Sequence, residues 1–312
     1  MTTAPIELIP GPLSRPDWLR VRLPADSGNY AEIKGLMRGL NLHTVCEEAR
    51  CPNIGECWGH RTATFMILGD ICTRACRYCA VKSGKPYELD ASEPMHVAEA
   101  VRVMGLKHAV VTSVDRDDLP DFGSGQFADT IRRIKELSPD CAVEVLTPDF
   151  QAEEAALKIV LDAGPDIFNH NIETVERVFP RVRPGRSEYR KSLAVLKRAK
   201  EVDASILTKS GLMVGLGEVE DEVRRTMRDL REVEVDIVTI GQYLRPTAKH
   251  VAIDRYVHPE EFARYKRFGL EIGFSHVESG PLVRSSYHAH EQTQMLQARR
   301  AQMATIEGGF AQ

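Results

Sequence analysis

Three cysteines with a fixed spacing carry the strongest chemical signal in the sequence. Cys72, Cys76 and Cys79 form a Cys-x3-Cys-x2-Cys triplet directly after a predicted strand. Three thiolates suit a 4Fe-4S cluster with one open iron, because a purely structural cluster of this type normally takes four protein ligands. An open iron can bind a small molecule. A zinc knuckle is the alternative, but structural zinc needs a fourth ligand, and none follows Cys79 at the usual spacing.

A second cysteine triplet lies upstream of the first. Cys46, Cys51 and Cys57 are spaced Cys-x4-Cys-x5-Cys. Six cysteines overfill one cubane, so two clusters with three thiolates each is the economical interpretation. A redox pair or a zinc site in this segment remains open as an alternative. The seventh cysteine, Cys141, stands alone at the start of a predicted strand and is interpreted as a small buried hydrophobe.

The elements that must position these cysteines alternate between strand and helix. Short apolar or β-branched runs predict six strands, at 62–68, 108–112, 142–146, 166–168, 207–214 and 236–240. Helical periodicity lies between them, at 94–104, 126–137, 152–161, 189–200 and 220–233. This alternation predicts an α/β fold with a parallel sheet, and we favour a partial, TIM-like (β/α)6 barrel over a doubly wound sheet.

The predicted barrel divides the chain into three parts. Residues 1–61 form an N-terminal extension with the upstream cysteines, and residues 62–283 form the barrel. Residues 284–312 form a C-terminal extension with a helix at about 288–303.

Polar loops follow the predicted strands at the end where parallel barrels build their active face. Thr112 ends the second predicted strand, Ser113 and Asp115 follow it, and Asn171 and Glu173 follow the fourth. Each of these residues alone could simply cap a helix or shape a turn. Together they predict a polar small-molecule site.

Composition limits the classes of partner. The chain has 312 residues, 43% hydrophobic and 28% charged, with a net charge of -4. This balance gives no overall electrostatic reason to bind nucleic acid or an anionic membrane surface. No apolar run approaches the roughly 20 residues that span a bilayer. Residues 1–30 contain prolines and charges where a secretory signal would be apolar, so we expect a cytoplasmic location without disulfides.

The spacing and position of Cys72, Cys76 and Cys79 resemble the radical S-adenosylmethionine superfamily. The resemblance implies that the methionyl amine and carboxylate of S-adenosylmethionine chelate the open iron. Electron transfer then cleaves the sulfonium to methionine and a 5'-deoxyadenosyl radical, which abstracts hydrogen from an unactivated carbon. Tyr78 also matches the superfamily, where an aromatic residue packs beside the adenine. Ordinary packing of a loop aromatic is the alternative for Tyr78.

The segment from Leu42 to Trp58 is similar to the N-terminal cluster signature of the lipoyl synthase family. The similarity extends through 62–70, 111–118, 168–174, 211–218 and 284–289. Residues 121–125 depart from the family, where a turn richer in glycine and alanine is usual, so the shape of that loop stays open. The resemblance implies a sulfurtransferase that inserts two sulfur atoms, at C6 and C8 of an octanoyl chain attached to a lysine of a carrier protein.

The resemblance also implies the cofactors and their ligands. It implies two 4Fe-4S clusters and S-adenosylmethionine, with the auxiliary cluster at Cys46, Cys51 and Cys57 dismantled as the sulfur source. The auxiliary cluster's fourth ligand falls on Ser286, with Ser285 less favoured, whereas helix capping is the alternative role for both serines. Thr112, Ser113 and Asp115 would meet the methionyl group. Asn171 and Glu173 would meet the ribose hydroxyls.

The implied partners are proteins. One is an octanoylated lipoyl carrier domain or the glycine-cleavage H protein, and another is an electron donor such as ferredoxin or flavodoxin. Three other interpretations compete with this one. A ferredoxin-like electron carrier would not need a barrel, and a zinc-stabilised scaffold protein would be colourless. Biotin synthase also inserts sulfur at unactivated carbon but lacks the N-terminal triplet.

Overall fold

The fold is known from a computed structural model, which describes residues 14–20, 34–35, 37–40, 42–44, 47, 53–54, 64–183 and 185–286. The upstream triplet (Cys46, Cys51 and Cys57) and the predicted helix at 288–303 lie outside the described residues.

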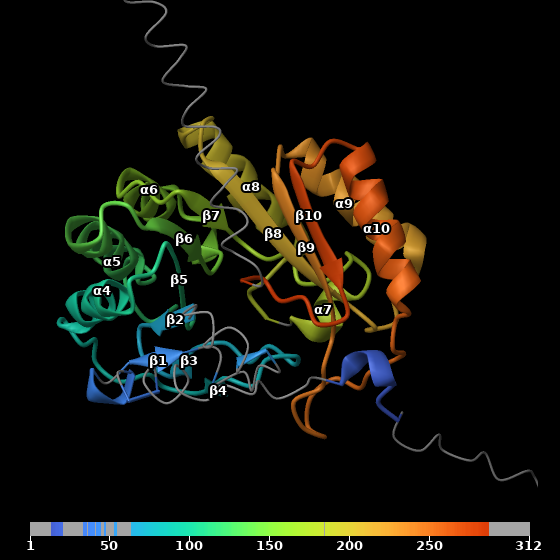
Figure 1. The fold of residues 1–312 in the computed structure, drawn as a ribbon, viewed down its shortest axis with the longest axis horizontal. Helices are drawn as coiled ribbons and strands as arrows, with labels where there is room; N and C mark the ends of the chain where they lie inside the picture. The colour runs from blue at the N-terminus through green and yellow to red at the C-terminus, as the bar shows by residue number, and fades with distance from the viewer. Residues whose placement is uncertain are drawn as a thin grey trace, which may run out of the picture.

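One curved sheet of eight strands organises the described chain (Figure 1). Its strands, in spatial order, are β1 (His43–Thr44), β2 (Thr64–Ile67), β5 (His108–Ser113), β6 (Ala142–Leu146), β7 (Ile167–Asn169), β8 (Leu207–Val214), β9 (Ile237–Gln242) and β10 (His276–Gly280). Every neighbouring pair from β2 to β10 is parallel, whereas β1 runs antiparallel to β2. The predicted α/β fold with a parallel sheet is confirmed, and all six predicted strands are present.

Two short strands form a separate ribbon. β3 (Ile71–Cys72) pairs with β4 (Lys82–Ser83), and the downstream cysteine triplet lies on β3 and in the loop between the two strands. β10 was not among the predicted strands. Its sequence, His-Val-Glu-Ser-Gly, has only one buried side chain, that of Val277, so it lacks the apolar run that marks the other parallel strands.

Helices connect the parallel strands. They are α4 (Glu93–Met104), α5 (Ser124–Leu137), α6 (Glu154–Asp162), α7 (Phe179–Val182), α8 (Tyr189–Val202), α9 (Glu220–Glu232) and α10 (Pro259–Glu271), with 3-10 turns η1 (Asp17–Leu19) and η2 (Phe150–Ala152). The five predicted helices are present, with ends shifted by at most two residues. The sequence prediction missed α7 and α10, although α10 begins with Pro259, which suits a first helical turn.

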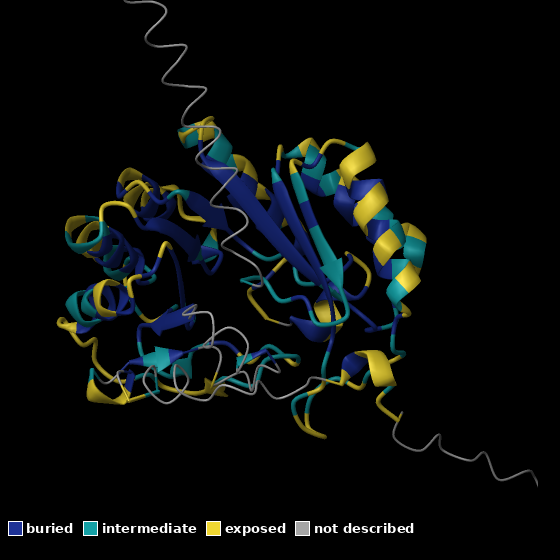
Figure 2. Ribbon diagram, viewed as in Figure 1, coloured by how far each residue is buried: buried dark blue, intermediate teal, exposed yellow. Residues whose placement is uncertain are grey.

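The helices cover the outer face of the sheet, and their apolar sides face it (Figure 2). In α9, for example, Val223, Met227 and Leu230 recur at helical spacing and are fully buried. Burial of such a side chain contributes about 1.5–3 kcal/mol. None of the helices that the structure describes is both long and apolar enough to span a membrane.

A buried ion pair ties the middle strands together. Lys209 Nζ on β8 lies 3.0 Å from Glu144 Oε1 on β6, and both side chains have no exposed surface. His108 and Asn169 complete the group through contacts of 3.2 and 2.8 Å with the same carboxylate. Burial opposes ionisation of Glu144, but the charge of Lys209 and the hydrogen bond with His108 outweigh it and lower its pKa to about 2.

Candidate active site

A cavity of about 630 Å³ lies at the carboxyl ends of the parallel strands. Ser113 at the end of β5, Asn171 after β7 and Gln242 at the end of β9 all line it. Every predicted site residue that the structure describes lines this one cavity: Cys72, Cys76, Tyr78, Cys79, Thr112, Ser113, Asp115, Asn171, Glu173, Ser285 and Ser286. The parallel sheet explains this convergence, because its strands end at one common edge.

The loop with the downstream triplet is held by backbone hydrogen bonds at both ends. Thr73 N donates to Asp115 O after β5 (3.0 Å), and Gly84 N donates to Cys72 O (2.9 Å). Cys72 Sγ itself accepts from two backbone N–H groups, those of Arg74 (3.4 Å) and Asp115 (3.3 Å). This environment favours a sulfur that carries negative charge, as a metal-bound thiolate does.

In the absence of a metal, burial outweighs the hydrogen bonds and charges that favour ionisation of the three thiols. Burial raises the pKa of Cys72 to about 12, and the nearby Asp115 carboxylate adds to the effect. Burial likewise raises the pKa of Cys76 and Cys79 to about 11. A catalytic nucleophile needs a lowered pKa, so these cysteines are poor nucleophiles. Iron can displace their protons, because thiolate is the ligand form.

The three thiols border one cavity and can serve as separate ligands of a cluster. Within the described ranges, no three His, Cys, Asp or Glu side chains are grouped so as to hold one metal ion. A cubane does not need such a point of convergence, since each thiolate binds its own iron at a separate corner. Cys72, Cys76 and Cys79 are also free of disulfides and border the cavity, which leaves room for a ligand at a fourth corner.

Orphaned polar atoms in the cavity wall suit a polar ligand. Among the described residues, Ser113 Oγ and Arg183 Nε are buried without a hydrogen-bond partner. Burial raises the pKa of Asp115, and the charges of Arg74 and Arg183 oppose this rise. A cavity with a buried cation, a buried carboxyl group and an unsatisfied hydroxyl can bind a zwitterion. Sequence reasoning missed Arg183, because it is one of three arginines within residues 181–186, and such a basic run is usually exposed to solvent.

Glu173 holds a backbone conformation that is unusual for its residue type. Its φ is 68°, in the left-handed region. Two hydrogen bonds to β8 keep it there, from Glu173 N to Gly211 O (3.0 Å) and from Met213 N to Glu173 O (2.8 Å). Burial raises the pKa of its carboxyl group, against the charge of Arg183 and hydrogen bonds with Tyr78 and Asn171. Such maintained strain is typical of ligand-binding positions.

The two predicted serines contact different parts of the cavity wall. Asn171 Nδ2 donates to Ser285 Oγ (2.9 Å), whereas Thr64 Oγ1 on β2 donates to Ser286 Oγ (2.8 Å). Two glycines make room for this approach. A Cβ at Gly211 would lie 2.8 Å from Asn171 Oδ1, and one at Gly241 would lie 2.2 Å from the backbone oxygen of Val283.

The glycine-rich turn at 215–218 does not line the cavity. Glu218 folds back on it and accepts hydrogen bonds from Gly215 N (2.6 Å) and Leu216 N (2.8 Å). Gly215 and Gly217 have φ of 95° and 97°, which L side chains rarely adopt. The turn therefore ends β8.

Comparisons with known families agree with this geometry. The family model "Radical SAM superfamily" matches residues 66–230, and the model "N-terminal domain of lipoyl synthase of Radical_SAM family" matches residues 12–51. The lipoyl synthase of Rubrobacter xylanophilus is 65% identical over 295 residues, which cover 93% of this chain and 91% of the relative. That of Halalkalibacterium halodurans is 58% identical, with 91% of this chain and 94% of the relative covered.

Solved structures share the fold at low identity. Methylornithine synthase (PylB) superposes with a TM-score of 0.53 at 14% identity over 69% of this chain and 71% of its own. The FeFe-hydrogenase maturase HydG from Carboxydothermus hydrogenoformans gives 0.52 at 14% identity over 86% and 78%. These likenesses confirm the partial-barrel fold.

Proposed function

Because this chain belongs to the lipoyl synthase family of the radical S-adenosylmethionine superfamily, we propose that the cavity at the strand ends is where it performs the family's reaction. The enzyme is a sulfurtransferase that inserts sulfur at C6 and C8 of an octanoyl chain on a lysine of a lipoyl carrier, with two 4Fe-4S clusters and S-adenosylmethionine as cofactors. The cofactors supply a carbon-centred radical and, from the auxiliary cluster, the sulfur. The observation that carries the placement is the convergence of the cysteine loop and the polar strand ends on one cavity.

The cluster ligands follow from this placement. We assign Cys72, Cys76 and Cys79 to the cluster that binds S-adenosylmethionine, and the upstream triplet with Ser286 to the auxiliary cluster. The support for Ser286 is its position in the wall of the same cavity as the downstream triplet. A hydroxyl is a weaker ligand for iron than thiolate, so this corner of the auxiliary cluster can be released.

S-adenosylmethionine would be bound by the buried polar groups of the wall. Arg183 supplies a cation for the methionyl carboxylate, and Ser113 Oγ has free hydrogen-bonding capacity among the described residues. Thr112 is less available, because its hydroxyl already donates to Leu146 O (2.8 Å). Asp115 supplies a carboxylate for the methionyl amine.

The remaining wall residues suit the adenosyl part of the cofactor. Asn171 and Glu173 provide an amide and a carboxylate for the ribose hydroxyls, and both line the cavity. Tyr78 lies in the same wall, half-buried, and provides an aromatic face for the adenine.

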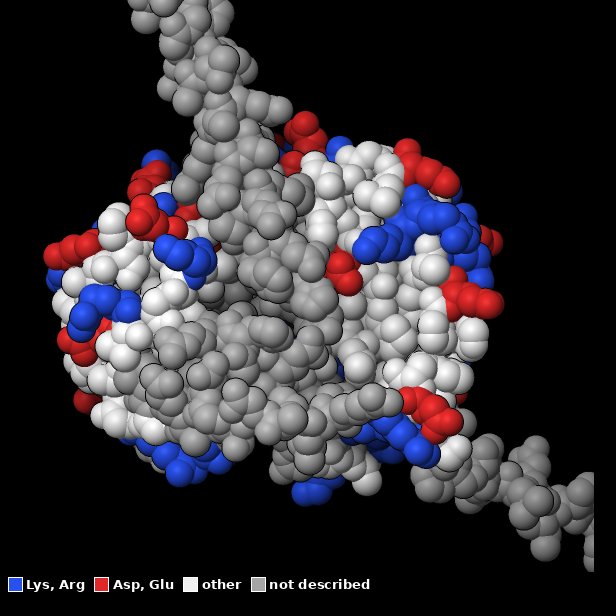
Figure 3. Space-filling model, viewed as in Figure 1, with Lys and Arg blue, Asp and Glu red and all other residues white. Residues whose placement is uncertain are grey.

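Further parts of the proposal concern partners and organisation. The glycine-cleavage H protein is one carrier, a ferredoxin or flavodoxin is the electron donor, and the cytoplasm is the location. Residues 1–61, 62–283 and 284–312 act as the auxiliary-cluster extension, the barrel and the serine-bearing extension. In the view of Figure 3, Lys and Arg side chains gather over α10 with Asp and Glu side chains beside them, and Arg264 of α10 pairs with Glu220 of α9.

An isotope experiment tests the function and the placement together. Clusters are built with heavy sulfide, and the enzyme is assayed anaerobically with an octanoyl-lysyl peptide, a reductant and S-adenosylmethionine in natural-abundance sulfide. We expect peptide products that gain one and then two heavy sulfur atoms. Light sulfur in the first turnover would contradict the auxiliary cluster as donor. A reaction without S-adenosylmethionine is the control and should give no product.

A further inference from the structure

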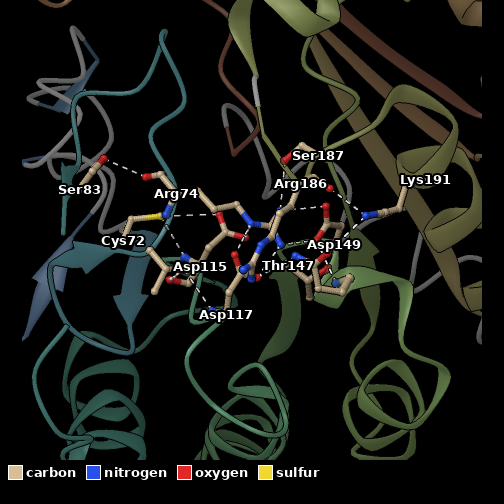
Figure 4. Close-up of polar contacts among 12 residues, drawn as sticks. Cys72, Arg74, Ser83, Asp115, Asp117, Thr147, Asp149, Arg186, Ser187 and Lys191 are labelled. Atoms are coloured by element: carbon tan, nitrogen blue, oxygen red, sulfur yellow. Dashed lines mark hydrogen bonds and ion pairs between the residues drawn. The ribbon is translucent and has the colours of Figure 1, made fainter. Parts of the chain in front are cut away.

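Arg74 lies inside the cysteine loop, between Cys72 and Cys76, and its side chain is only 5% exposed. It makes paired hydrogen bonds to two carboxylates (Figure 4). Nε and Nη2 donate to the two oxygens of Asp117 (2.9 and 2.8 Å). Nη1 and Nη2 donate to the two oxygens of Asp149 (2.8 and 2.6 Å). Arg74 is therefore held by a double fork that only a guanidinium can form.

The hydrogen bonds of the Arg74 side chain join four separate parts of the chain. Asp117 follows β5, Asp149 follows β6, and Ser187, which accepts from Arg74 Nη1 (3.1 Å), precedes α8. A further bond from Gln151 Nε2 to Asp117 Oδ1 (2.9 Å) links the first two parts to each other. The carboxylates are as buried as the arginine, with side-chain exposures of 9% and 1%. Solvent therefore screens this network little, and loss of one member leaves buried charge unpaired.

The network ends at the sulfur of Cys72. The two backbone N–H groups that donate to Cys72 Sγ belong to Arg74 and Asp115. Asp115 is also tied to the loop, because its backbone oxygen accepts from Thr73 N (3.0 Å) and Thr73 Oγ1 (2.9 Å). The position of both N–H donors thus depends on the contacts that hold Arg74 and the loop after β5 together.

We propose that Arg74 is a positioning residue for the S-adenosylmethionine-binding cluster: its double fork to Asp117 and Asp149 fixes the cysteine loop and keeps two N–H donors on Cys72 Sγ. The inference rests on the proposed ligation of that cluster by Cys72. N–H donors on a ligating sulfur stabilise the reduced cluster, which carries one more negative charge than the oxidised one, and so raise its reduction potential.

The sign of the potential shift separates positioning from a plain charge effect. If the network acted only through charge, Arg74→Gln would make the potential more negative, because a cation is lost, and Asp149→Asn would make it more positive, because an anion is lost. If it acts by holding the N–H donors, both variants loosen the loop. Both then move the potential in the same direction, to more negative values.

The experiment compares these two variants with the unchanged holoenzyme. The midpoint potential is measured by anaerobic redox titration of the electron paramagnetic resonance signal that responds to S-adenosylmethionine. We expect more negative midpoints for Arg74→Gln and Asp149→Asn alike. Shifts of opposite sign, or no shift in either variant, would overturn the proposal. Arg116→Gln is the matched control. Buried Arg116 makes a similar fork to Asp118 (2.9 and 2.9 Å), but both residues lie in the loop after β5 and the fork does not reach the cysteine loop. Its potential should stay unchanged.

A second measurement tests the loop without the cluster. Hydrogen exchange of the full chain before reconstitution should be about tenfold faster in residues 72–84 of Arg74→Gln, the change that about 1.4 kcal/mol produces. Unchanged exchange there would overturn the positioning role alone. Absence of any signal that responds to S-adenosylmethionine in the unchanged holoenzyme would instead overturn the assignment of Cys72, Cys76 and Cys79. The two failures are therefore distinguishable.

Discussion

Thr64 Oγ1 donates a 2.8 Å hydrogen bond to Ser286 Oγ, although 222 positions separate the two residues in the sequence. Thr64 lies on β2 in the buried face of the sheet, and Ser286 is the last residue that the structure describes. Ser286, the proposed ligand of the auxiliary cluster, thus contacts the strand that pairs with β1. In the sequence, β1 comes just before the upstream cysteines.

Ser286 variants should separate cluster assembly from sulfur release. Ser286→Cys should give a cluster that assembles but releases its iron slowly, because thiolate binds iron more strongly than a hydroxyl does. Sulfur insertion should slow while S-adenosylmethionine cleavage persists. Ser286→Ala should instead weaken the hold on that iron. Single-turnover product counts and anaerobic iron-release measurements check these outcomes.

The neighbouring serine provides the control for this prediction. Ser285→Ala removes the hydrogen bond with Asn171 and should cost about 1 kcal/mol of folding free energy, with iron release unchanged. If both Ser286 variants insert sulfur normally and Ser285→Ala does not, the ligand is Ser285.

Replacement of the two cysteine triplets should abolish different steps of the reaction. Each enzyme molecule should hold about eight irons, as two 4Fe-4S clusters. Replacement of Cys72, Cys76 and Cys79 by Ala should halve the iron content and abolish S-adenosylmethionine cleavage. Replacement of Cys46, Cys51 and Cys57 by Ala should also halve the iron but preserve cleavage and abolish sulfur insertion. Equal cleavage by both triple variants would refute this division of roles.

Glu173 should increase the affinity for S-adenosylmethionine, while its strained backbone conformation should lower the stability of the fold. Glu173→Gln keeps the volume but removes the charge, and we expect about tenfold weaker binding of S-adenosylmethionine, as for loss of a charged hydrogen bond. The Glu173→Gly and Glu173→Ala variants should both bind S-adenosylmethionine weakly. The glycine variant should be about 1 kcal/mol more stable than the alanine variant, because alanine keeps the strain at a φ of 68°. Binding titrations and thermal unfolding measure both effects, and equal stability of the two would rule out the strain.

The buried pair of Glu144 and Lys209 should make the stability of the fold depend on pH in the acidic range. The pKa of Glu144 is lowered from 4.5 to about 2, so its contribution is present above pH 4.5 and is lost as the pH falls through 2. The loss should be on the order of 3 kcal/mol in the free energy of unfolding. Glu144→Gln should flatten this dependence and cost about 3–5 kcal/mol at neutral pH, because the buried Lys209 ammonium loses the carboxylate charge of Glu144.

A double variant and a surface control sharpen the test. Adding Lys209→Met to Glu144→Gln should recover part of the loss, since the buried ammonium is then removed together with the carboxylate. Asp162→Asn breaks the exposed pair with Lys158 and should change stability by less than about 1 kcal/mol. Denaturant unfolding across the acidic range measures all three. If the stability losses caused by Glu144→Gln and Lys209→Met simply added in the double variant, the two charges would not be coupled.

The sequence predicted the parts of the structure that depend on local pattern. Strands such as β8 have continuous buried runs, and helices such as α9 have a clear apolar face, so both were found from periodicity. The cavity could also be predicted, because a parallel sheet collects the residues after its strands at one edge. The roles of Thr112 and Glu173 there remain predictions.

What the sequence could not reveal depends on contacts between distant residues. Arg183 looks like one more surface arginine in a basic run, and only tertiary packing buries it beside Cys76 and Glu173. The fork of Arg74 needs carboxylates that are 43 and 75 positions away. β10 was missed because its pairing with β9, rather than its composition, makes it a strand.

The segment 281–286 leaves β10 at one edge of the sheet and reaches β2 near the other edge. On the way Leu282 O accepts from Asn53, Arg284 donates to Gln242 O, and Ser285 meets Asn171. A complete barrel would join its first and last strands by a ladder of backbone hydrogen bonds. Here a few hydrogen bonds made by residues 282–286 span that distance, and the last of them joins Ser286 to Thr64. Because Ser286 ends this connection through its bond with Thr64, the residue that we propose as a cluster ligand would also help to hold the two edges of the sheet together.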